Sequence, residues 1–236
     1  MRRRRSSTTA VVVLVAGSLA AIALLVYTTR RLLAPRRERR HERKRAQASV
    51  PDAPPDHGLD HQGEASGVGE LTHRHYAIVV PRSTFTCQSL IRQIQQRVHE
   101  LSPSALAAFE KTSGDASLMS VGDEYDVTML GPWNGRVRVA EVTDNSFTLV
   151  TLEGHPEAGH ITFSVRELPE RTDAFKVVIE SWARARDKAV HVAYDTLSVG
   201  RQVQAEVWVT FLQRVAELTG GDEVPEVDID SEELTT

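Results

Sequence analysis

The chain has 236 residues, of which 41% are hydrophobic and 25% are charged, a composition typical of a globular domain with appendages. Its charge is unevenly distributed, because residues 1–50 hold thirteen Lys and Arg against two Glu, whereas residues 51–236 hold fifteen basic and thirty acidic side chains. The single cysteine, Cys87, excludes a disulfide framework and a multi-cysteine metal site, and is more typical of a small buried hydrophobe than of a reactive thiol.

A long apolar run follows the basic N-terminus formed by residues 1–9. No residue from Ser6 to Thr29 is charged, and ten of the residues in 10–27 are Leu, Ile or Val. As a helix, this run is long enough to cross a hydrocarbon core of about 30 Å. A signal peptide has a shorter apolar core followed by a cleavage site, whereas arginines follow here. We therefore predict a single-pass transmembrane helix over 10–29, with a cleaved signal peptide and a buried soluble helix as alternatives.

Residues 30–45 form a basic juxtamembrane segment with nine Lys and Arg, against four arginines before the span. The positive-inside rule therefore predicts that the globular part lies in the cytoplasm. Basic residues beside a bilayer are attracted to anionic headgroups, which is a simpler reading of this cluster than nucleic-acid binding. The predicted partner is an anionic membrane surface, bound through Arg30, Arg31, Arg36, Arg37, Arg39 and Arg40.

Two segments show no helical or strand periodicity. Residues 46–73 are rich in Pro, Gly and Asp and predict a flexible linker, in which a metal-binding histidine pair is disfavoured because helix-breaking residues surround it. His73 and His75, at its end, are expected to be exposed. Residues 222–236 hold seven acidic residues and no basic one, which predicts a disordered acidic tail. A calcium loop is disfavoured there because the glycine turn is missing.

Residues 74–221 show the periodicities of a folded domain. The run "YAIVV" at 76–80 predicts a short strand. Apolar residues then recur at helical spacing over 90–101 and predict an amphipathic helix. Ser102 and the proline after it form a helix start signal, so a second short helix is expected to carry Phe109 to the core.

From Tyr125 onward the period changes to two. Apolar residues alternate in five successive runs, which the turn-forming stretches "GPWNG", "TDN", "EGHPEAG" and "PERTD" separate. This pattern predicts an antiparallel meander of five strands. The last element, about 187–218, keeps its apolar residues close to one side and stops at "TGG", as a long amphipathic helix does.

The predicted order is strand, two helices, five strands and a long terminal helix. One curved antiparallel sheet wrapped around that helix would bury both the alternating faces and the apolar stripe. The expected fold class is therefore α+β of the helix-grip type, with a cavity between sheet and helix, preceded by the transmembrane helix.

Two stretches also carry a resemblance to a known family. They are "LGPWNGRVRVAEVTDNSFTLVTLEGHPEAGHITFSV" and "HVAYDTLSVGRQVQAEVWVTFLQRVAELTGG". Together they resemble the family of domain of unknown function nineteen-ninety over about residues 76–221, most recognisably in the Gly-His-Pro-Glu turn. The resemblance implies a START-like helix-grip fold, whose members hold apolar or amphipathic ligands such as lipids, sterols or polyketides. It implies no particular reaction.

The turn in "TLEGHPEAGHITF" holds His155, Glu157 and His160. Two imidazoles and a carboxylate could hold a catalytic zinc or move protons near neutral pH. They could also form the polar rim of a ligand cavity. Because side chains at the tip and base of a hairpin diverge as often as they meet, the favoured interpretation is structural, with these three residues as weak catalytic candidates.

Four aromatic residues are candidates to line the cavity and orient an apolar ligand: Trp133, Trp182, Tyr194 and Trp208. Core packing is the alternative for each of them. No phosphate-binding glycine loop, nucleophile elbow or paired carboxylate motif occurs, so neither a cofactor nor a metal is predicted.

The sequence is compatible with three functions. The favoured one is a membrane-anchored module that binds an apolar or lipid-like small molecule. The second is a membrane-tethered scaffold with a filled core that binds a partner protein. The third, less favoured, is an enzyme that uses the histidines and the glutamate of the turn.

Overall fold

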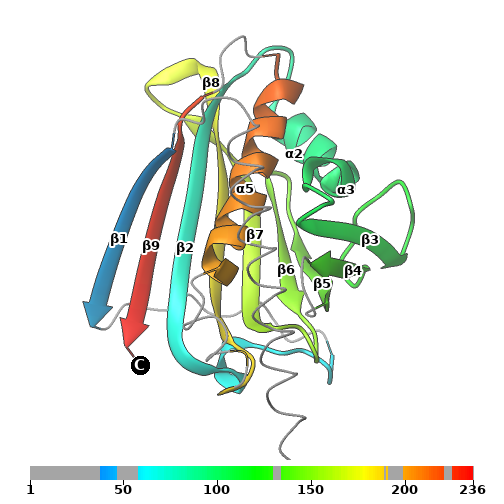
Figure 1. Cartoon of the computed structure of the whole chain (residues 1–236). Coiled ribbons are helices and arrows are strands. Elements are labelled where there is room, and N and C mark those ends of the chain that lie inside the picture. The colour runs from blue at the N-terminus through cyan, green and yellow to red at the C-terminus, as the bar shows by residue number, and fades with distance from the viewer. Residues whose placement is uncertain are drawn as a thin grey trace, which may run out of the picture.

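The computed structural model describes residues 38–46, 58–129, 134–188, 190, 199–220 and 225–235. Within them, one nine-stranded sheet runs in the order β1-β9-β2-β8-β7-β6-β5-β4-β3, and helix α5 lies across one face (Figure 1). The strands are β1 Glu38–Ala46, β2 Val68–Pro81, β3 Ala107–Ser113, β4 Glu124–Met129, β5 Gly135–Val142, β6 Ser146–Thr151, β7 Glu157–Leu168, β8 Arg171–Ala185 and β9 Val227–Thr235. The helices are η1 Glu64–Ser66, α2 Cys87–Gln96, α3 Val98–Leu101 and α5 Val199–Leu218.

The predicted meander is confirmed as β4 to β8, in which each strand pairs antiparallel with the next. Alternation along these strands produces two faces. The inner face, toward α5, carries the large apolar residues Val139, Leu149, Phe163, Val177 and Ile179, all of them buried in one cluster. The expected α+β fold with a curved sheet and a long helix is therefore confirmed, although the sheet is mixed because β1 pairs parallel with β9.

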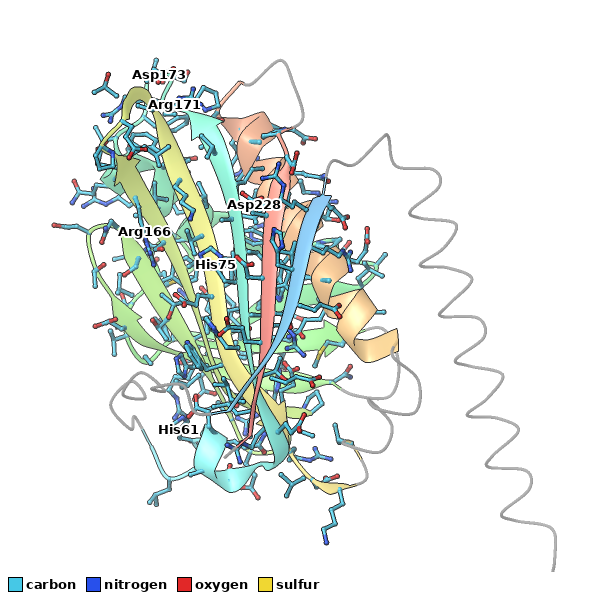
Figure 2. All side chains as sticks on the ribbon, turned by 90° about the vertical axis from the view of Figure 1, so that its left-hand side faces the viewer. His61, His75, Arg166, Arg171, Asp173 and Asp228 are labelled. Atoms are coloured by element: carbon cyan, nitrogen blue, oxygen red, sulfur yellow. The ribbon has the colours of Figure 1, made fainter. Side chains whose placement is uncertain are left out.

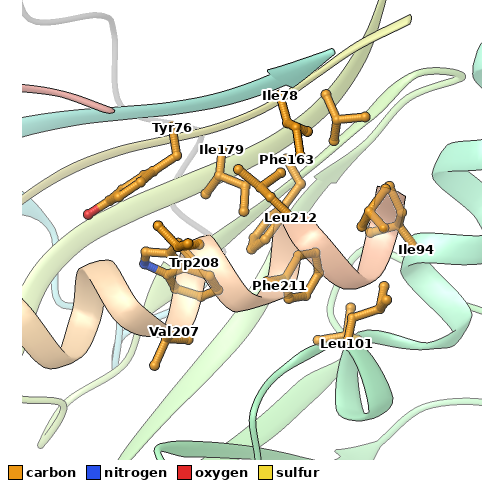
Figure 3. Packing of buried hydrophobic residues seen from close by; sticks show 14 of the residues in the cluster. Tyr76, Ile78, Ile94, Leu101, Phe163, Ile179, Val207, Trp208, Phe211 and Leu212 are labelled. Atoms are coloured by element: carbon orange, nitrogen blue, oxygen red, sulfur yellow. The ribbon is translucent and has the colours of Figure 1, made fainter. Parts of the chain in front are cut away.

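Helix α5 is the C-terminal part of the helix predicted over 187–218, and residues 191–198 lie outside the described part of the chain. Its aromatic residues pack against the inner face, with ring centroids 5.6 Å apart for Trp208 and Phe163 and 5.4 Å for Phe211 and Phe163 (Figure 3). On its other side, Trp208 lies 6.5 Å from Phe109 on β3. Burying each such side chain contributes about 1.5–3 kcal/mol, so α5 is the central element of the core.

The first predicted helix is confirmed as α2 and α3, with a break at Arg97 and an N-cap at Thr86, whose hydroxyl accepts from the Ser89 amide at 3.1 Å. The second predicted helix is wrong, because residues 107–113 form strand β3. The Ser102 hydroxyl donates to the Ala107 carbonyl instead of capping a helix. The serine–proline pair therefore closes a turn, although Phe109 reaches the core as expected.

The disordered acidic tail predicted over 222–236 is wrong for residues 227–235, which form β9 between β1 and β2. Val227, Ile229 and Leu234 are buried, so an alternating apolar pattern lies within the acidic sequence. The inner face holds Val227 and Ile229 in the main cluster, and Leu234 packs with Leu71 and Trp182 on the outer face. A strand forms here because these apolar side chains have buried positions to occupy.

Part of the basic segment predicted to contact a membrane is also a strand. Strand β1 pairs in parallel with β9, so that Arg39 lies opposite Asp228. The Arg39 Nε lies 3.0 Å from a carboxylate oxygen of Glu226, and the Arg40 Nη2 lies 2.6 Å from Glu38. Arg39 and Arg40 therefore have acidic partners within the chain.

The transmembrane helix predicted over 10–29 lies outside the described residues, as do Arg30, Arg31, Arg36 and Arg37 of the predicted membrane surface. Among the helices that the structure does describe, none combines the length and the apolar character that crossing a membrane requires.

The linker predicted over 46–73 is wrong for its second half. Strand β2 begins at Val68, and the segment before it contains η1 and a bridge between His61 and Leu152. Gln62 in this segment is buried. The proline-rich part, residues 47–57, lies outside the described residues.

Candidate functional site

The Gly-His-Pro-Glu turn is built as a structural element around His155. Gly154 has a φ of +95°, a conformation that favours glycine, and the buried His155 ring accepts a hydrogen bond from the Glu157 amide at its Nδ1, at 3.1 Å. The ring packs against Gly135, where a Cβ atom would lie 2.1 Å from His155 Cδ2. Burial lowers the pKa of His155, so its imidazole is neutral at neutral pH.

Gln62 fixes the same turn from the segment that precedes β2. Its Nε2 donates to the carbonyls of His155 and Glu157, both at 2.8 Å, and its Oε1 accepts from the Gly154 amide at 3.2 Å. One side chain therefore satisfies three backbone groups of the turn, which holds the start of β7 in a fixed position.

The three candidate residues of the turn do not converge. His155 contacts backbone, Glu157 points to the inner face, and His160 lies on the outer face, where its Nδ1 is hydrogen-bonded to Glu64. Burial disfavours ionisation of Glu64, but the hydrogen bond to His160 holds the pKa of that carboxyl below its usual range. Of the residues in the described part of the chain, no group of His, Cys, Asp and Glu is arranged to hold a metal ion.

The four aromatic candidates also separate. Trp133 and Tyr194 lie outside the described residues. Trp182 lies on the outer face, where its ring stacks on His73 with 3.8 Å between centroids, whereas Trp208 faces the inner side of the sheet. Trp182 is excluded from a site beneath α5 because its neighbour Ser181 occupies the inward position on β8.

Histidines and acids line the outer face of β2, β8 and β9. The His73 Nε2 lies 2.8 Å from Glu180, and the His75 Nδ1 lies 4.0 Å from Asp230 (Figure 2 labels His75). Both histidines are half-buried, in contrast to the exposed positions expected from sequence. Burial lowers the pKa of His75. The pairs join three strands.

Cys87, at the start of α2, is half-buried and lies 3.5 Å from a Glu167 carboxylate oxygen. Burial and this carboxylate raise the pKa of the thiol to about 11. The thiolate, which is the nucleophilic form, is therefore scarce at neutral pH. This agrees with the interpretation of Cys87 as a small hydrophobe.

A polar cluster lies on the inner face, beneath the first half of α5. We define it as Arg74, Tyr76, Glu157, Ser181, Gln204 and Trp208. Arg74 on β2 is buried, and its Nη1 lies 3.4 Å from Glu157 Oε1. Gln204 on α5 donates from Nε2 to the other Glu157 oxygen at 2.9 Å. Three elements that are distant in sequence therefore meet at one carboxylate.

The rest of the cluster follows from strand and helix geometry. Ser181 lies directly opposite Arg74 in the β2–β8 register, and Tyr76 is two residues further along the same face. Trp208 is one helical turn after Gln204 and shares its side of α5. In Figure 3 the Tyr76 hydroxyl and the Trp208 indole nitrogen both lie toward the start of α5.

Burial raises the pKa of Tyr76 to about 12, although the charges of Arg74 and Arg40 oppose that shift. Its hydroxyl is therefore protonated at neutral pH. The adjoining inner face carries small residues, because Gly159 pairs with Ala183 and Ala183 also pairs with Thr72. The sheet beneath the start of α5 thus presents small side chains beside polar ones.

Three buried polar atoms of the cluster have no hydrogen-bond partner among the residues that the structure describes. They are Ser181 Oγ, Gln204 Oε1 and Trp208 Nε1. Ser181 is 3% exposed and Trp208 7%. Most buried polar atoms in proteins are paired, so unpaired ones on one inner surface call for an explanation.

Sequence reasoning missed Arg74, Ser181 and Gln204. Arg74 lies just before residues 76–80, the run that predicted a strand. It is two residues from Tyr76, so in an extended strand both side chains face the same side, and this spacing could have identified Arg74. Gln204 is four residues before Trp208. The sequence did not predict that β2, β7 and α5 meet, because the order of strands in a sheet depends on tertiary packing and not on local sequence patterns.

Several solved structures are similar in fold. Norcoclaurine synthase from Thalictrum flavum, in complex with dopamine and hydroxybenzaldehyde, is 16% identical, with 75% of this chain and 99% of that chain covered at a TM-score of 0.45. A conserved protein from Geobacillus kaustophilus is 12% identical, with 63% and 95% covered at 0.43. A di-domain ARO/CYC protein of the steffimycin biosynthetic pathway is 10% identical, with 64% and 50% covered at 0.46.

A search of curated proteins finds no match. The family model described as domain of unknown function (DUF1990) matches residues 73–217, which is more than half of the chain. This confirms the resemblance found in the sequence. The protein therefore belongs to the DUF1990 family.

Proposed function

We propose that this domain binds an amphipathic small molecule between the inner face of the sheet and α5. The polar end of the molecule contacts the polar cluster, and its apolar part lies along the neighbouring aromatic residues Phe163, Trp208 and Phe211. The unpaired atoms of Ser181, Gln204 and Trp208, buried beside the apolar core, are the observation that carries this proposal.

Physical chemistry favours a ligand with two unlike ends. Apolar surface at the cluster's edge favours a hydrocarbon body, since burial from water is favourable in proportion to the apolar area. A few placed polar groups then fix its orientation and discriminate between ligands. The turn of residues 154–157 contributes by positioning Glu157, and not by chemistry of His155.

The proposal includes a membrane anchor, which rests on the sequence of residues 10–29 and on no other observation. An anchored module would exchange its ligand with the bilayer beside it. Carbonate extraction of cell membranes tests the anchor. The full chain should stay in the membrane pellet, whereas a chain that begins at residue 30 should be released to the supernatant.

Native mass spectrometry of the full chain, purified in a mild detergent, tests the binding function. The wild-type chain should retain a hydrophobic mass that Arg74→Ala and Trp208→Ala lose. Arg166→Ala is the matched control, because Arg166 lies on the outer face and is half exposed. A wild-type chain without any bound mass, in several lipid extracts, would instead favour the scaffold with a filled core.

A further inference from the structure

The charges around the polar cluster are already balanced. Arg74 is paired with Glu157, and Arg40, whose charge also acts on the Tyr76 hydroxyl, is paired with Glu38 at 2.6 Å. A charged ligand group placed between these pairs would have no counter-ion of its own. Desolvating such a group is costly unless a partner compensates it.

The unpaired atoms define which hydrogen bonds a ligand can make. Gln204 donates from Nε2 to Glu157, and a carboxylate can only accept. The orientation of the Gln204 amide is therefore fixed, and the Gln204 Oε1 is an acceptor. The Trp208 indole nitrogen can only donate, and the Ser181 hydroxyl can do either. The site thus offers a donor and an acceptor on one helix, with an adaptable hydroxyl on the sheet opposite.

Resting on the proposed function, we infer that the polar end of the ligand is an uncharged hydroxyl group, as in an alcohol or a phenol. A hydroxyl donates to Gln204 Oε1 and accepts from Trp208 Nε1 at the same time. A ketone accepts from Trp208 but leaves Gln204 unpaired. A carboxylate cannot donate to Gln204 and meets the charge of Glu157, whereas an ammonium cannot accept from Trp208 and meets the charge of Arg74.

A matched series of ten-carbon probes tests this inference on the full chain in zwitterionic lipid nanodiscs. Titration calorimetry at pH 7.5, with empty nanodiscs as the blank, gives the Kd of decan-1-ol, decan-2-one, decanoate, decylamine and decane. We expect decan-1-ol to bind most tightly and decan-2-one about tenfold more weakly, the effect of one lost hydrogen bond. Decanoate and decylamine are expected to bind at least about a hundredfold more weakly than decan-1-ol.

Two variants locate the preference at the cluster. Trp208→Phe keeps an aromatic ring and removes the N–H, so it should weaken decan-1-ol and decan-2-one alike, about tenfold, and leave decane unchanged. Gln204→Leu removes the acceptor and should weaken decan-1-ol to the level of decan-2-one. The outer-face variant Arg166→Ala should leave all five values unchanged.

The possible outcomes separate this inference from the function on which it rests. Tightest binding of decanoate or decylamine, or equal binding of all five probes, overturns the hydroxyl preference and leaves the binding module intact. Failure of every probe, decane included, overturns the binding module as well. The ranking in the wild-type chain is decisive by itself if a variant does not fold.

Discussion

Arg74 on β2 and Glu157 on β7 meet on the inner side of β8, the strand that separates theirs, although they are 83 positions apart in the sequence. The contact explains what the Gly-His-Pro-Glu turn does. His155 and Gln62 fix the backbone at the start of β7, so that the Glu157 carboxylate points beneath α5. The Gly-His-Pro-Glu motif thus positions the Glu157 carboxylate.

Removing Arg74 should destabilise the domain because it leaves the half-buried Glu157 carboxylate with Gln204 as its remaining side-chain partner. We expect Arg74→Ala to lower the free energy of unfolding by about 2–4 kcal/mol. The double variant Arg74→Met with Glu157→Gln should cost less than the sum of the two single variants, because it removes both charges together. Urea unfolding of the full chain in detergent measures both. Strict additivity would show that the pair is not coupled.

A methyl group at Gly135 should displace the His155 ring, since its Cβ would lie 2.1 Å from His155 Cδ2. We expect Gly135→Ala to lower the free energy of unfolding by about 1–3 kcal/mol. Adding His155→Ala should recover part of that loss by making room for the methyl group. If the losses in free energy of unfolding of the two variants simply add, Gly135 and His155 do not pack against each other.

Stability should fall as the pH drops below neutral because His155 is buried in its neutral form. Its folded pKa is lowered below the ordinary value of about 6.5, so above that pH neither state is protonated and His155 contributes no pH dependence. Below about 6.5 the unfolded chain gains a proton that the folded chain resists, at up to about 1.4 kcal/mol per pH unit. The loss is complete once the pH passes the lowered folded pKa.

The pKa of the half-buried His75 is lowered as well, so two histidines act in the same pH window. His155→Gln should reduce the slope of stability against pH between 6.5 and 5, measured by thermal unfolding. His99→Gln, at an exposed position, is the matched control. A slope that does not change in His155→Gln contradicts the burial of a neutral imidazole.

Strand β9 should tolerate loss of charge better than loss of apolar character. Ile229→Asp places a carboxylate in the main core and should cost on the order of 3 kcal/mol. Asp228→Asn breaks a long, exposed ion pair with Arg39 and should cost less than about 1 kcal/mol. Hydrogen exchange should also show protected amides over 227–234. Equal, negligible effects of both changes would mean that this segment is a disordered tail after all.

The sequence patterns predicted which helices and strands form better than they predicted which of these elements lie side by side. Strands β4 to β8 were readable because each alternates apolar and polar residues and tight turns connect them in order. Strand β9 was missed because its acidic residues masked the alternation of Val227 and Ile229. Its partner β1 lies at the other end of the chain, and no local pattern reports such a pairing.

The site was less predictable than the fold, for two reasons. Parity along β8 decides that Ser181 faces α5 and Trp182 faces outward, and a shift of one residue would exchange them. The polar cluster also depends on β2 lying beside β8, which the order of elements does not determine. Trp208 was identified because its helical position already indicated the core.

A ligand that lies against the inner face should reach Trp208. The chain has three tryptophans, so labelling with 5-fluorotryptophan gives three fluorine resonances, which single Trp→Phe variants assign. On titration with decan-1-ol, we expect a shift of the Trp208 resonance and an unchanged Trp182 resonance on the outer face. A Trp208 resonance that does not move when the probe is in excess would contradict this placement of the ligand.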